Sequence, residues 1–256
     1  MPQSGSLYAD LSGYYDQFCA EIDYASQCDF AHRACSLFVT SPARDYLDLA
    51  CGTGQHMQLM QMHGYTVSGL DNSAAMLAQA AVRCPAAALL LCDLAGFTHA
   101  SSFDLITCFL YSIHYSHPAA ALQQTLQRAW TALKPGGLLL FNTVDARGIR
   151  NDEGVVTNIT TVDAKLSFQS AWHYRGEGEV LDLYLRITQA TATGSRQWQD
   201  HHTMTALTVP QLQQMLAACG FQVQLLEHDY SVLRPWDGLS HNVIVAACKP
   251  ALTGLA

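Results

Sequence analysis

The segment 47–54, Leu-Asp-Leu-Ala-Cys-Gly-Thr-Gly, constrains the fold more than any other part of the chain. A short apolar strand is predicted over 45–50, and it runs directly into a turn that contains Gly52 and Gly54. A helical pattern follows over 55–63. Glycines at such a turn let the backbone bend sharply and let a ligand approach the main chain. A strand, a glycine turn and a helix in this order predict a parallel α/β sheet with a ligand site at the carboxyl ends of its strands.

Short apolar runs and helical patterns alternate beyond this turn, as they do in sheets built from β-α-β units. Further strands of the sheet are predicted at 65–70, 88–92, 103–109, 138–144, 221–226 and 242–247. Further helices are predicted at about 73–84, 118–133 and 209–220. The run 134–137, Lys-Pro-Gly-Gly, is expected to stop a helix and turn the chain. Because crossovers between parallel strands are right-handed, the sheet is expected to be doubly wound.

The pattern changes between 155 and 205, where Thr, Val, Tyr and Trp alternate with polar residues and three glycines interrupt the run. Such alternation predicts antiparallel strands, for example at 165–174 and 180–191. We therefore expect one α/β domain that carries a β-rich insertion. The core with an N-terminal helical cover takes 1–145, the insertion takes 146–206 and is expected to act as a substrate lid, and 207–256 complete the core.

Acidic residues follow two of the predicted strands on the same side as the glycine turn. Asp71 ends the second strand, where a carboxylate can accept hydrogen bonds from both ribose hydroxyls of a nucleoside. Asp93 follows the third strand and can accept from an adenine amino group, with the apolar Leu94 beside the ring. A glycine turn and two acids at three successive strand ends predict one nucleoside cleft. The fingerprint of nicotinamide dinucleotides needs a third small residue, but Met57 stands in its place.

Composition limits the partners and the location. Only 13% of the residues are charged, the formal net charge is −8, and the sequence has no Lys/Arg cluster, which argues against a nucleic-acid partner. None of the nine cysteines forms a Cys-x-x-Cys motif, so no metal site is expected. No apolar run reaches the roughly 18 residues of a membrane span, and the first residues do not resemble a signal peptide. We expect a cytoplasmic protein with reduced thiols and no membrane partner.

Taken as a set, these motifs resemble those of the class I methyltransferases that use S-adenosylmethionine (SAM). The segment 47–54 is similar to motif I of that family, and Asp71, Asp93 and 103–115 are similar to the motifs that follow it. The runs 133–141 and 207–221 are similar to the family's fifth strand and to its last helix and sixth strand. The resemblance covers about 7–145 and 205–248. It implies a Rossmann-like sheet of seven strands in which the last strand is antiparallel.

The N-terminal run 7–18 contains a Tyr-Asp pair at Tyr15 and Asp16 and resembles the members that methylate small molecules, including amino-sugar N-methyltransferases. In those members an N-terminal helix covers SAM and a tyrosine meets its carboxylate. This makes Tyr15 and Tyr24 candidates and Tyr8 a weaker one. The cofactor-binding residues expected in total are Tyr15, Tyr24, Asp48, Ala50, Cys51, Gly52, Gly54, Asp71, Asn72, Met76, Cys92, Asp93, Leu94 and Phe109.

The acceptor side is less constrained. Methyl transfer needs a nucleophile held in line with the sulfonium, and a hydroxyl nucleophile also gains from a general base. His114 is the first candidate for a base or an orienting group, because the loop after the fourth strand faces the same cleft. Tyr115 and His241 are the next candidates.

The sequence thus predicts a SAM-dependent methyltransferase that modifies an amine, or in second place a hydroxyl, of a small molecule and releases S-adenosylhomocysteine. Two other classes stay open. A modifier of tRNA or protein would show a salt-dependent activity, and a SAM-binding protein without catalysis would bind the cofactor and turn over no acceptor. A nicotinamide enzyme is a more distant alternative. A monomer or a homodimer is expected.

Overall fold

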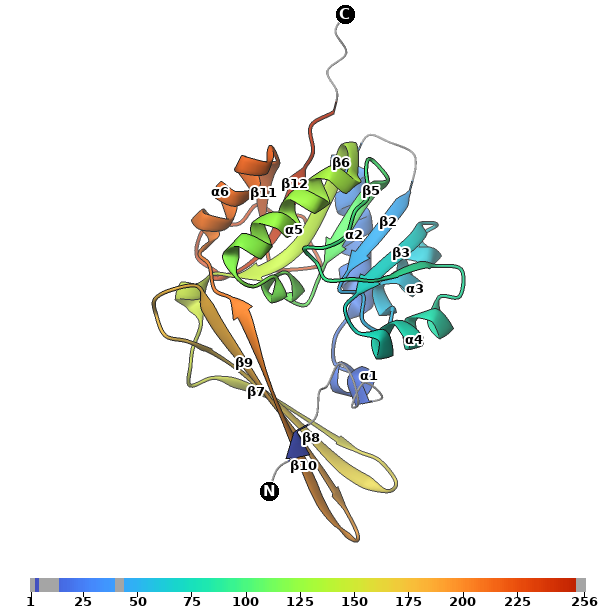
Figure 1. Cartoon of the computed structure of the whole chain (residues 1–256), viewed down its shortest axis with the longest axis vertical. Helices are drawn as coiled ribbons and strands as arrows, with labels where there is room; N and C mark the ends of the chain where they lie inside the picture. Colours follow the sequence, from blue (N-terminus) through green and yellow to red (C-terminus); the bar gives the residue numbers. More distant parts are fainter. Residues whose placement is uncertain (1–2, 5–13, 40–43, 252–256) are drawn as a thin grey trace, which may run out of the picture.

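The computed structural model describes residues 3–4, 14–39 and 44–251, which form two sheets and the helices around them (Figure 1). In chain order the strands are β1 (Gln3–Ser4), β2 (Asp45–Leu49), β3 (Thr66–Asp71), β4 (Ala88–Leu91), β5 (Phe103–Cys108), β6 (Leu133–Val144), β7 (Gly154–Thr160), β8 (Ala164–Tyr174), β9 (Val180–Thr191), β10 (Gly194–Thr205), β11 (Gln222–Glu227) and β12 (Asn242–Cys248). The α-helices are α1 (Tyr15–Phe18), α2 (Tyr24–Phe38), α3 (Gln55–Met62), α4 (Ala74–Arg83), α5 (Ala119–Ala132) and α6 (Val209–Cys219). Two short 3-10 helices are η2 (Ser112–Tyr115) and η3 (Ala146–Gly148).

The larger sheet has seven strands in the order β11-β12-β6-β5-β2-β3-β4. Neighbours from β6 to β4 pair in parallel, whereas β12 is antiparallel to both β6 and β11. The predicted Rossmann-like sheet with an antiparallel last strand is confirmed. Because β2 has β3 on one side and β5 on the other, the strand order reverses at β2. A ligand site is expected at the carboxyl ends of the strands beside such a reversal.

Helices cover both faces of this sheet (Figure 1). On one face α2, α3 and α4 bury Phe30, Met57 and Ala80 in a common core with the strands. On the other face α5 and α6 bury Leu126 and Leu216. All six residues of β5, at the centre of the sheet, are buried, as expected of a parallel strand that is covered on both faces.

Side-chain caps set the ends of the helices that flank the carboxyl edge. The Ser73 side chain accepts a hydrogen bond from the Met76 N–H and begins α4 directly after Asp71. Thr208 and Gln211 form a capping box at the start of α6, each bonding to the other's backbone. These local signals explain why both helices begin within a residue or two of the predicted positions.

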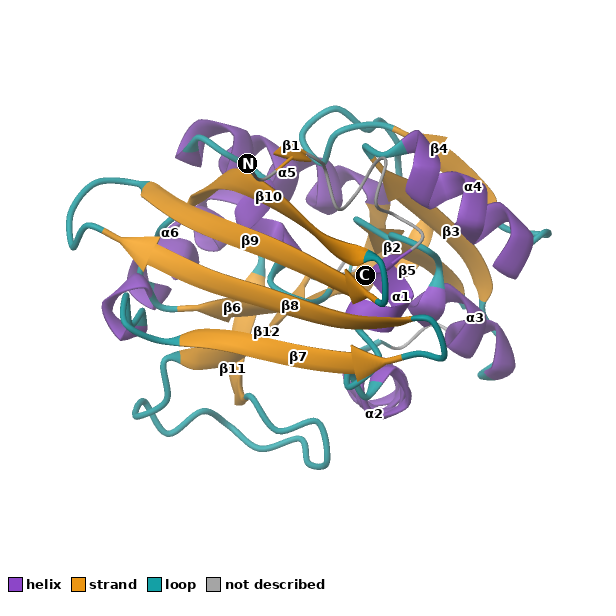
Figure 2. Ribbon diagram, turned by 90° about the horizontal axis from the view of Figure 1, so that it is seen from below, coloured by secondary structure: helices purple, strands orange, loops and turns teal. Residues whose placement is uncertain are grey.

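The second sheet has the strand order β1-β10-β9-β8-β7, and β7 to β10 pair antiparallel throughout. Figure 2 shows these strands side by side, lying across one end of the larger sheet. The inner face buries Phe168, Ile187 and Trp198 against Ala146 and the partly buried Phe18. The predicted antiparallel insertion is therefore confirmed. The division of the chain at 146 and 206, and the role of this sheet as a lid, are kept as proposals.

Two features differ from the predicted elements. The sequence predicts a turn at 134–137, but β6 already begins at Leu133, because Gly136 and Gly137 exchange backbone hydrogen bonds with Lys249 just beyond β12. The sequence also gives no sign of β1, which pairs in parallel with β10 through two residues. In the part of the chain that the structure describes, no helix is long and apolar enough to cross a membrane.

Candidate functional site

The glycine turn between β2 and α3 forms one wall of the candidate site. Gly52 and Gly54 adopt left-handed φ values of +53° and +84°. A Cβ at Gly54 would lie 3.1 Å from Met57 Cε and 3.3 Å from the Ala80 backbone, so a larger residue would push α3 and α4 apart. A Cβ at Gly52 would meet only Tyr15, at 3.8 Å. The turn therefore packs closely on the side of the core and presents a bare backbone on the side of α1.

Asp71 is held at the end of β3 by the backbone around it. Its Oδ2 accepts the Gly52 N–H at 2.9 Å, and its Oδ1 accepts the Ser73 N–H at 2.8 Å. The side chain is buried, and burial raises the pKa of the carboxyl above its ordinary value. Each carboxylate oxygen can accept further hydrogen bonds. Beside it, the exposed Asn72 side chain donates to Asp93 Oδ1 at 3.3 Å, so the two predicted acids lie at one edge.

A cavity of about 1830 Å³ lies between this edge and the inner face of the second sheet. Pockets of roughly 300–1,000 Å³ hold a single drug-sized ligand, so this cavity has room for a nucleoside cofactor and a second small molecule. The predicted cofactor residues that line it are Tyr15, Ala50, Gly52, Asp71, Asn72, Met76, Cys92, Asp93 and Leu94. A small adjoining cavity is lined by Tyr24, Asp48, Cys51 and Phe109. Gly54 lines neither cavity and instead forms the start of α3.

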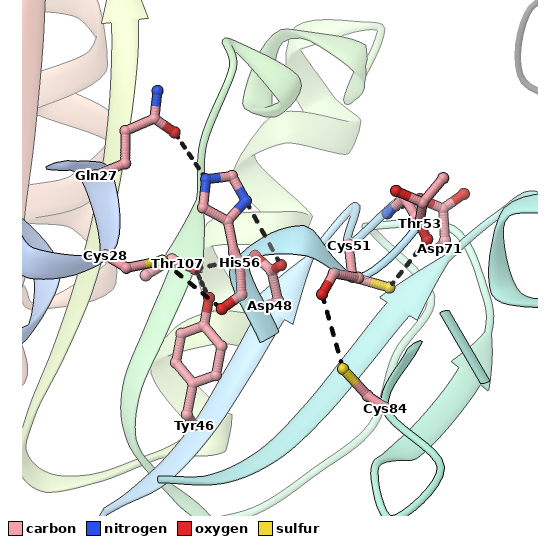
Figure 3. A network of polar contacts seen from close by, with 12 residues as sticks. Gln27, Cys28, Tyr46, Asp48, Cys51, Thr53, His56, Asp71, Cys84 and Thr107 are labelled. Carbon is pink, nitrogen blue, oxygen red and sulfur yellow. Dashed lines mark hydrogen bonds and ion pairs between the residues drawn. The ribbon is translucent and has the colours of Figure 1, made fainter. Parts of the chain in front are cut away.

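Asp48 belongs to a buried polar network behind the turn (Figure 3). Its Oδ1 accepts a hydrogen bond from Thr107 Oγ1 at 3.0 Å, and Tyr46 shares a hydrogen bond of 2.6 Å with the same hydroxyl. Its Oδ2 has no hydrogen-bond partner among the described residues, although His56 Nδ1 lies 3.9 Å away. His56 Nε2 is 2.7 Å from Gln27 Oε1. Since an amide oxygen only accepts, the imidazole proton belongs on Nε2.

The charges of this network follow from its burial. Burial raises the pKa of Asp48 to about 7, and the nearby charge of Asp71 acts in the same direction. Burial lowers the pKa of His56 to about 3, so this histidine is neutral and forms no ion pair with Asp48 at neutral pH. A buried carboxylate oxygen without a donor is costly. The small cavity beside it thus suits a ligand group that carries N–H or O–H donors.

The N-terminal helix α1 is tied to the glycine turn through Asp16. Asp16 Oδ1 accepts a hydrogen bond from Thr53 Oγ1 at 2.6 Å, and Arg83 Nη2 lies 2.6 Å from Asp16 Oδ2. The Arg83 guanidinium also donates to the Thr53 carbonyl. Tyr15 is thereby held against both cavities. Tyr8, the weaker tyrosine candidate, lies outside the described residues.

His114 does not lie where the sequence predicts it. It is buried in η2, with Nδ1 2.7 Å from the Thr205 carbonyl and Nε2 3.0 Å from Thr143 Oγ1 and 3.3 Å from the Val144 N–H. Burial lowers the pKa of its imidazole. His114 joins η2 to β6 and β10 and does not line the cavity. The loop after β5 folds inward at this residue, which corrects its assignment as a base.

The two other candidates for the acceptor side differ in whether they line the cavity. Tyr115, the next residue of η2, lines the cavity, and its ring meets the His202 ring edge-on at a centroid distance of 5.6 Å. His241 is exposed and does not line the cavity. Its carbonyl accepts the Asp145 N–H at 2.8 Å, and a Cβ on Gly148 would overlap its ring. The structure therefore brings Tyr115 to the cavity and leaves His241 beside it.

Some lining residues are missed by the sequence prediction. Asn242 begins β12 and accepts a hydrogen bond from Tyr111 Oη at 3.2 Å. Because β12 is antiparallel, its first residue lies at the carboxyl edge of its neighbours. The antiparallel last strand that the family resemblance implies could have indicated this position. The Tyr111 ring also meets the Trp172 ring edge-on at 5.0 Å. This contact joins the loop after β5 to β8 of the second sheet at the wall of the cavity.

Comparisons with known proteins agree with this geometry. The family profile described as a methyltransferase domain matches 47–137, a segment that holds the glycine turn and both acids. A protein of Geobacillus sp. (strain WCH70) that is named a methyltransferase is 31% identical over 142 residues, which are 53% of this chain and 56% of that protein. The chain is identified as a SAM-dependent methyltransferase that resembles the class I family.

Two further comparisons cover more of the chain of this methyltransferase. The dTDP-3-amino-3,6-dideoxy-α-D-glucopyranose N,N-dimethyltransferase of Streptomyces fradiae is 27% identical over 240 residues, which cover 85% of this chain and 88% of that protein. The sugar N-methyltransferase KedS8 of Streptoalloteichus sp. has the same fold, with a TM-score of 0.80 at 21% identity over 98% of this chain and 97% of that one. Both resemblances agree with the fold expected from the sequence.

SAM is the cofactor of this methyltransferase, and the residues at the cavity fit it. The bare backbone of the glycine turn allows close approach of a ligand. Asp71 presents a fixed carboxylate at the position expected for a ribose. The unpartnered Oδ2 of Asp48 offers an acceptor where a ligand ammonium can donate. These three features lie side by side at one edge of the sheet.

Proposed function

We propose that this methyltransferase transfers the methyl group of SAM to an amine of a small molecule and releases S-adenosylhomocysteine. The observation that carries the proposal is the cavity, which extends from the glycine turn and Asp71 to the inner face of the second sheet. Its volume of about 1830 Å³ accommodates a cofactor together with a small acceptor. The formal net charge of −8 does not suit a long polyanion such as RNA.

The extent of the sequence similarity supports an amine as the acceptor. The strands β7 to β10 take a fifth of the chain, from Gly154 to Thr205. A match that covers 85% of the chain must therefore reach beyond the core into this sheet. The matching protein of Streptomyces fradiae is named for an amino-sugar nucleotide and for N,N-dimethylation. We infer an acceptor with a related primary or secondary amine for this chain.

In this proposal the carboxyl edge binds the nucleoside part of SAM. Asp71 accepts from the ribose hydroxyls, since two backbone N–H groups already fix the orientation of its carboxylate. Asp93 and Asn72 lie at the same edge to meet the adenine amino group. The remaining proposed contacts of the adenosine part, which line the large cavity, are Ala50, Gly52, Met76, Cys92 and Leu94.

The methionine part of SAM is assigned to the junction of the two cavities, because the small one, of about 20 Å³, has room for little more than its ammonium group. Asp48 Oδ2 is placed to accept from its ammonium, and this contact would supply the donor that the buried oxygen lacks. Tyr15 lines the small cavity and the large one, which supports a role of α1 in covering the cofactor. The other proposed contacts here are Tyr24, Cys51 and Phe109, with Gly54 shaping the turn from behind.

Catalysis in this site rests on position. When bound, SAM supplies an electrophilic methyl group on a positively charged sulfur. The chain's own part is to hold the acceptor nitrogen in line with that methyl group, and such positioning lowers the barrier by several kcal/mol. Leu183, Leu185 and Met204 line the cavity from the second sheet and keep water away from the reacting atoms.

Calorimetry tests the cofactor half of the proposal. Wild-type protein is expected to bind SAM and S-adenosylhomocysteine with micromolar dissociation constants. Asp71→Ala is expected to weaken both at least tenfold, which corresponds to about 1.4 kcal/mol. Asp163→Ala, in the exposed turn between β7 and β8, is the matched control and should bind like wild type. Failure of well-folded wild type to bind either ligand would contradict the assigned site.

Formation of S-adenosylhomocysteine tests the part of the proposal that concerns the acceptor. S-adenosylhomocysteine formation is measured with dTDP-3-amino-3,6-dideoxy-α-D-glucopyranose, with a panel of small primary amines, and with the dTDP-sugar that carries a hydroxyl in place of the amine. Turnover of an amine and none of the hydroxyl compound supports N-methylation. Turnover of the hydroxyl compound alone would replace the amine by an alcohol as the acceptor class.

A further inference from the structure

The inner face of the second sheet carries one ionisable pair among apolar side chains. Trp172 on β8, Leu183 and Leu185 on β9, and Met204 on β10 line the cavity from this face. His202, on β10 and opposite Leu183 in the register, lines the cavity between them. An imidazole on an otherwise apolar wall of a ligand cavity is a candidate for chemistry.

Asp200 lies beside the imidazole, on the same face of the same strand. His202 Nε2 lies 3.1 Å from Asp200 Oδ2, and the other carboxylate oxygen, Oδ1, accepts the His201 backbone N–H at 3.0 Å. The exposed fractions of the two side chains are similar, 18% for His202 and 20% for Asp200. The backbone contact fixes the carboxylate, and the carboxylate faces the ring that lines the cavity.

The same strand offers a comparison on its opposite face. His201 Nε2 lies 2.8 Å from Asp182 Oδ1, and the His201 ring stacks on Tyr184 at 4.8 Å. The His201 side chain is 49% exposed and does not line the cavity. A histidine with an aspartate partner thus occurs on both faces of β10, and only the pair of His202 meets the cavity.

We propose that His202, oriented by Asp200, is the base that takes the proton from the acceptor amine. This inference rests on the proposed N-methylation. It replaces the prediction that His114 is the base, because both nitrogens of that ring are bonded inside the core. Tyr115 reaches the cavity beside the His202 ring and completes the wall around the acceptor nitrogen.

The proton and the electrons balance as follows. The acceptor ammonium gives one proton to the neutral imidazole of His202, and the electron pair of that N–H bond stays on the nitrogen. This pair forms the new bond to the methyl carbon, while the pair of the old carbon–sulfur bond stays on sulfur. The methylated ammonium leaves with S-adenosylhomocysteine. The imidazolium, beside the Asp200 carboxylate, returns its proton to solvent.

Burial keeps the imidazole in the form that a base requires. It lowers the pKa of His202, while the charge of Asp200 acts in the opposite direction and His201 adds a small further decrease. The other ionisable groups around this cavity wall are Tyr115, His117, Arg150, Asp152 and Glu153. The last three are paired with one another, with Arg150 Nε 3.4 Å from Asp152 and 3.8 Å from Glu153. The neutral form of His202 therefore predominates at neutral pH.

Three variants test the assignment with dTDP-3-amino-3,6-dideoxy-α-D-glucopyranose and the amine panel as acceptor probes. His202→Gln should lower kcat at least 100-fold at pH 7 and remove the acidic limb of the profile of kcat/KM against pH. Asp200→Asn should lower kcat and move that limb to lower pH, because it removes the charge that raises the pKa of His202. His201→Gln, on the opposite face, should leave kcat as in wild type and move the acidic limb only slightly to higher pH, because it removes the small decrease that His201 adds. All three should bind S-adenosylhomocysteine like wild type.

A second readout needs no turnover. In the S-adenosylhomocysteine complex, the ring nitrogens of His202 are followed by NMR against pH, and Asp200→Asn is expected to lower the midpoint of the His202 titration. An unchanged pH profile in an active His202→Gln variant would overturn the role of His202. Wild type that binds SAM and methylates none of the amines would instead overturn the proposed function on which this role depends.

Discussion

The buried Asp48 makes the stability of the fold depend on pH. In the unfolded chain its carboxyl ionises near the ordinary value of 3.8, whereas burial raises its pKa to about 7 in the folded chain. Between these values the folded chain holds one more proton than the unfolded chain, so its stability falls as the pH rises. Above about pH 7 the full cost is present, and the size of the shift puts it at roughly 4 kcal/mol.

Asp48→Asn is therefore expected to remove this pH dependence. The amide is neutral at every pH and its NH₂ group faces the unprotonated Nδ1 of His56, 3.9 Å from the present Oδ2. Between pH 5 and pH 8 the free energy of unfolding of wild type, measured in urea, should fall by on the order of 3 kcal/mol. That of the variant should not show this fall. The same pH dependence in both proteins would mean that Asp48 is ionised at pH 5 in the fold.

Residue-level predictions from the sequence depend on how far the local chain fixes a side chain. Asp71 ends a strand and is held by the backbone of the next turn, so its place at the carboxyl edge follows from the strand prediction. His114 sits in a loop whose direction is set by contacts with Thr143 and Thr205, from distant parts of the chain. No local pattern reveals whether such a residue faces the core or the cavity.

At the level of elements, α1 is held over the glycine turn mainly by polar contacts. Asp16 binds both Thr53 and Arg83, at 2.6 Å in each case, and no residue of this four-residue helix is buried. Phe18 packs against Phe168 of the second sheet, at a ring-centroid distance of 5.1 Å, so the contacts of α1 with the glycine turn itself are the polar ones. The carboxylate is thus expected to keep α1, with Tyr15, close to the cofactor.

Asp16→Asn is expected to loosen α1 without unfolding the core. The ion pair with Arg83 is partly exposed, so its loss should cost no more than about 1 kcal/mol of stability. The affinity for S-adenosylhomocysteine should fall several-fold in calorimetry, and chymotrypsin, which cleaves after Tyr and Phe, should cleave the chain at α1 faster. Asp29→Asn on α2 removes a partly exposed ion pair with His63 at the end of α3, so it is the control and should change neither readout. Equal affinity in both variants would argue that α1 has no part in cofactor binding.

The elements themselves could be predicted where their pattern is long or capped. α4, α5, α6 and β8 to β9 begin and end close to the predicted residues, since caps and alternation are local features. β1 could not be predicted, because two residues carry no periodicity and their pairing depends on β10. The start of β6 was missed because it depends on the pairing of Leu133 with Phe103 of β5 and on backbone contacts of Gly136 and Gly137 with Lys249, which are distant in the sequence.

At the level of the whole molecule, the cofactor and the acceptor are assigned to different sheets that face one cavity. Asp71 and the glycine turn belong to the larger sheet, whereas Trp172 and His202 belong to the second. The sequence predicts both sheets, but it does not predict how the two sheets face each other. That arrangement depends on contacts between them, such as the hydrogen bond of 2.7 Å from Thr205 Oγ1 to the Ser116 carbonyl and the Tyr111–Trp172 ring pair.

This division predicts that the two binding steps can be separated by mutation. Trp172→Ala removes a large aromatic surface from the acceptor side of the cavity, while the contacts proposed for SAM all lie on other elements. The KM for the amine acceptor should rise at least tenfold, and the affinity for S-adenosylhomocysteine should stay within twofold of wild type. Tyr184→Ala removes an aromatic ring from the outer face of the same sheet, where that residue is 49% exposed, and should change neither value. If Trp172→Ala instead weakened the cofactor and the acceptor equally, the second sheet would have to contact both, and the assignment of one ligand to each sheet would be wrong.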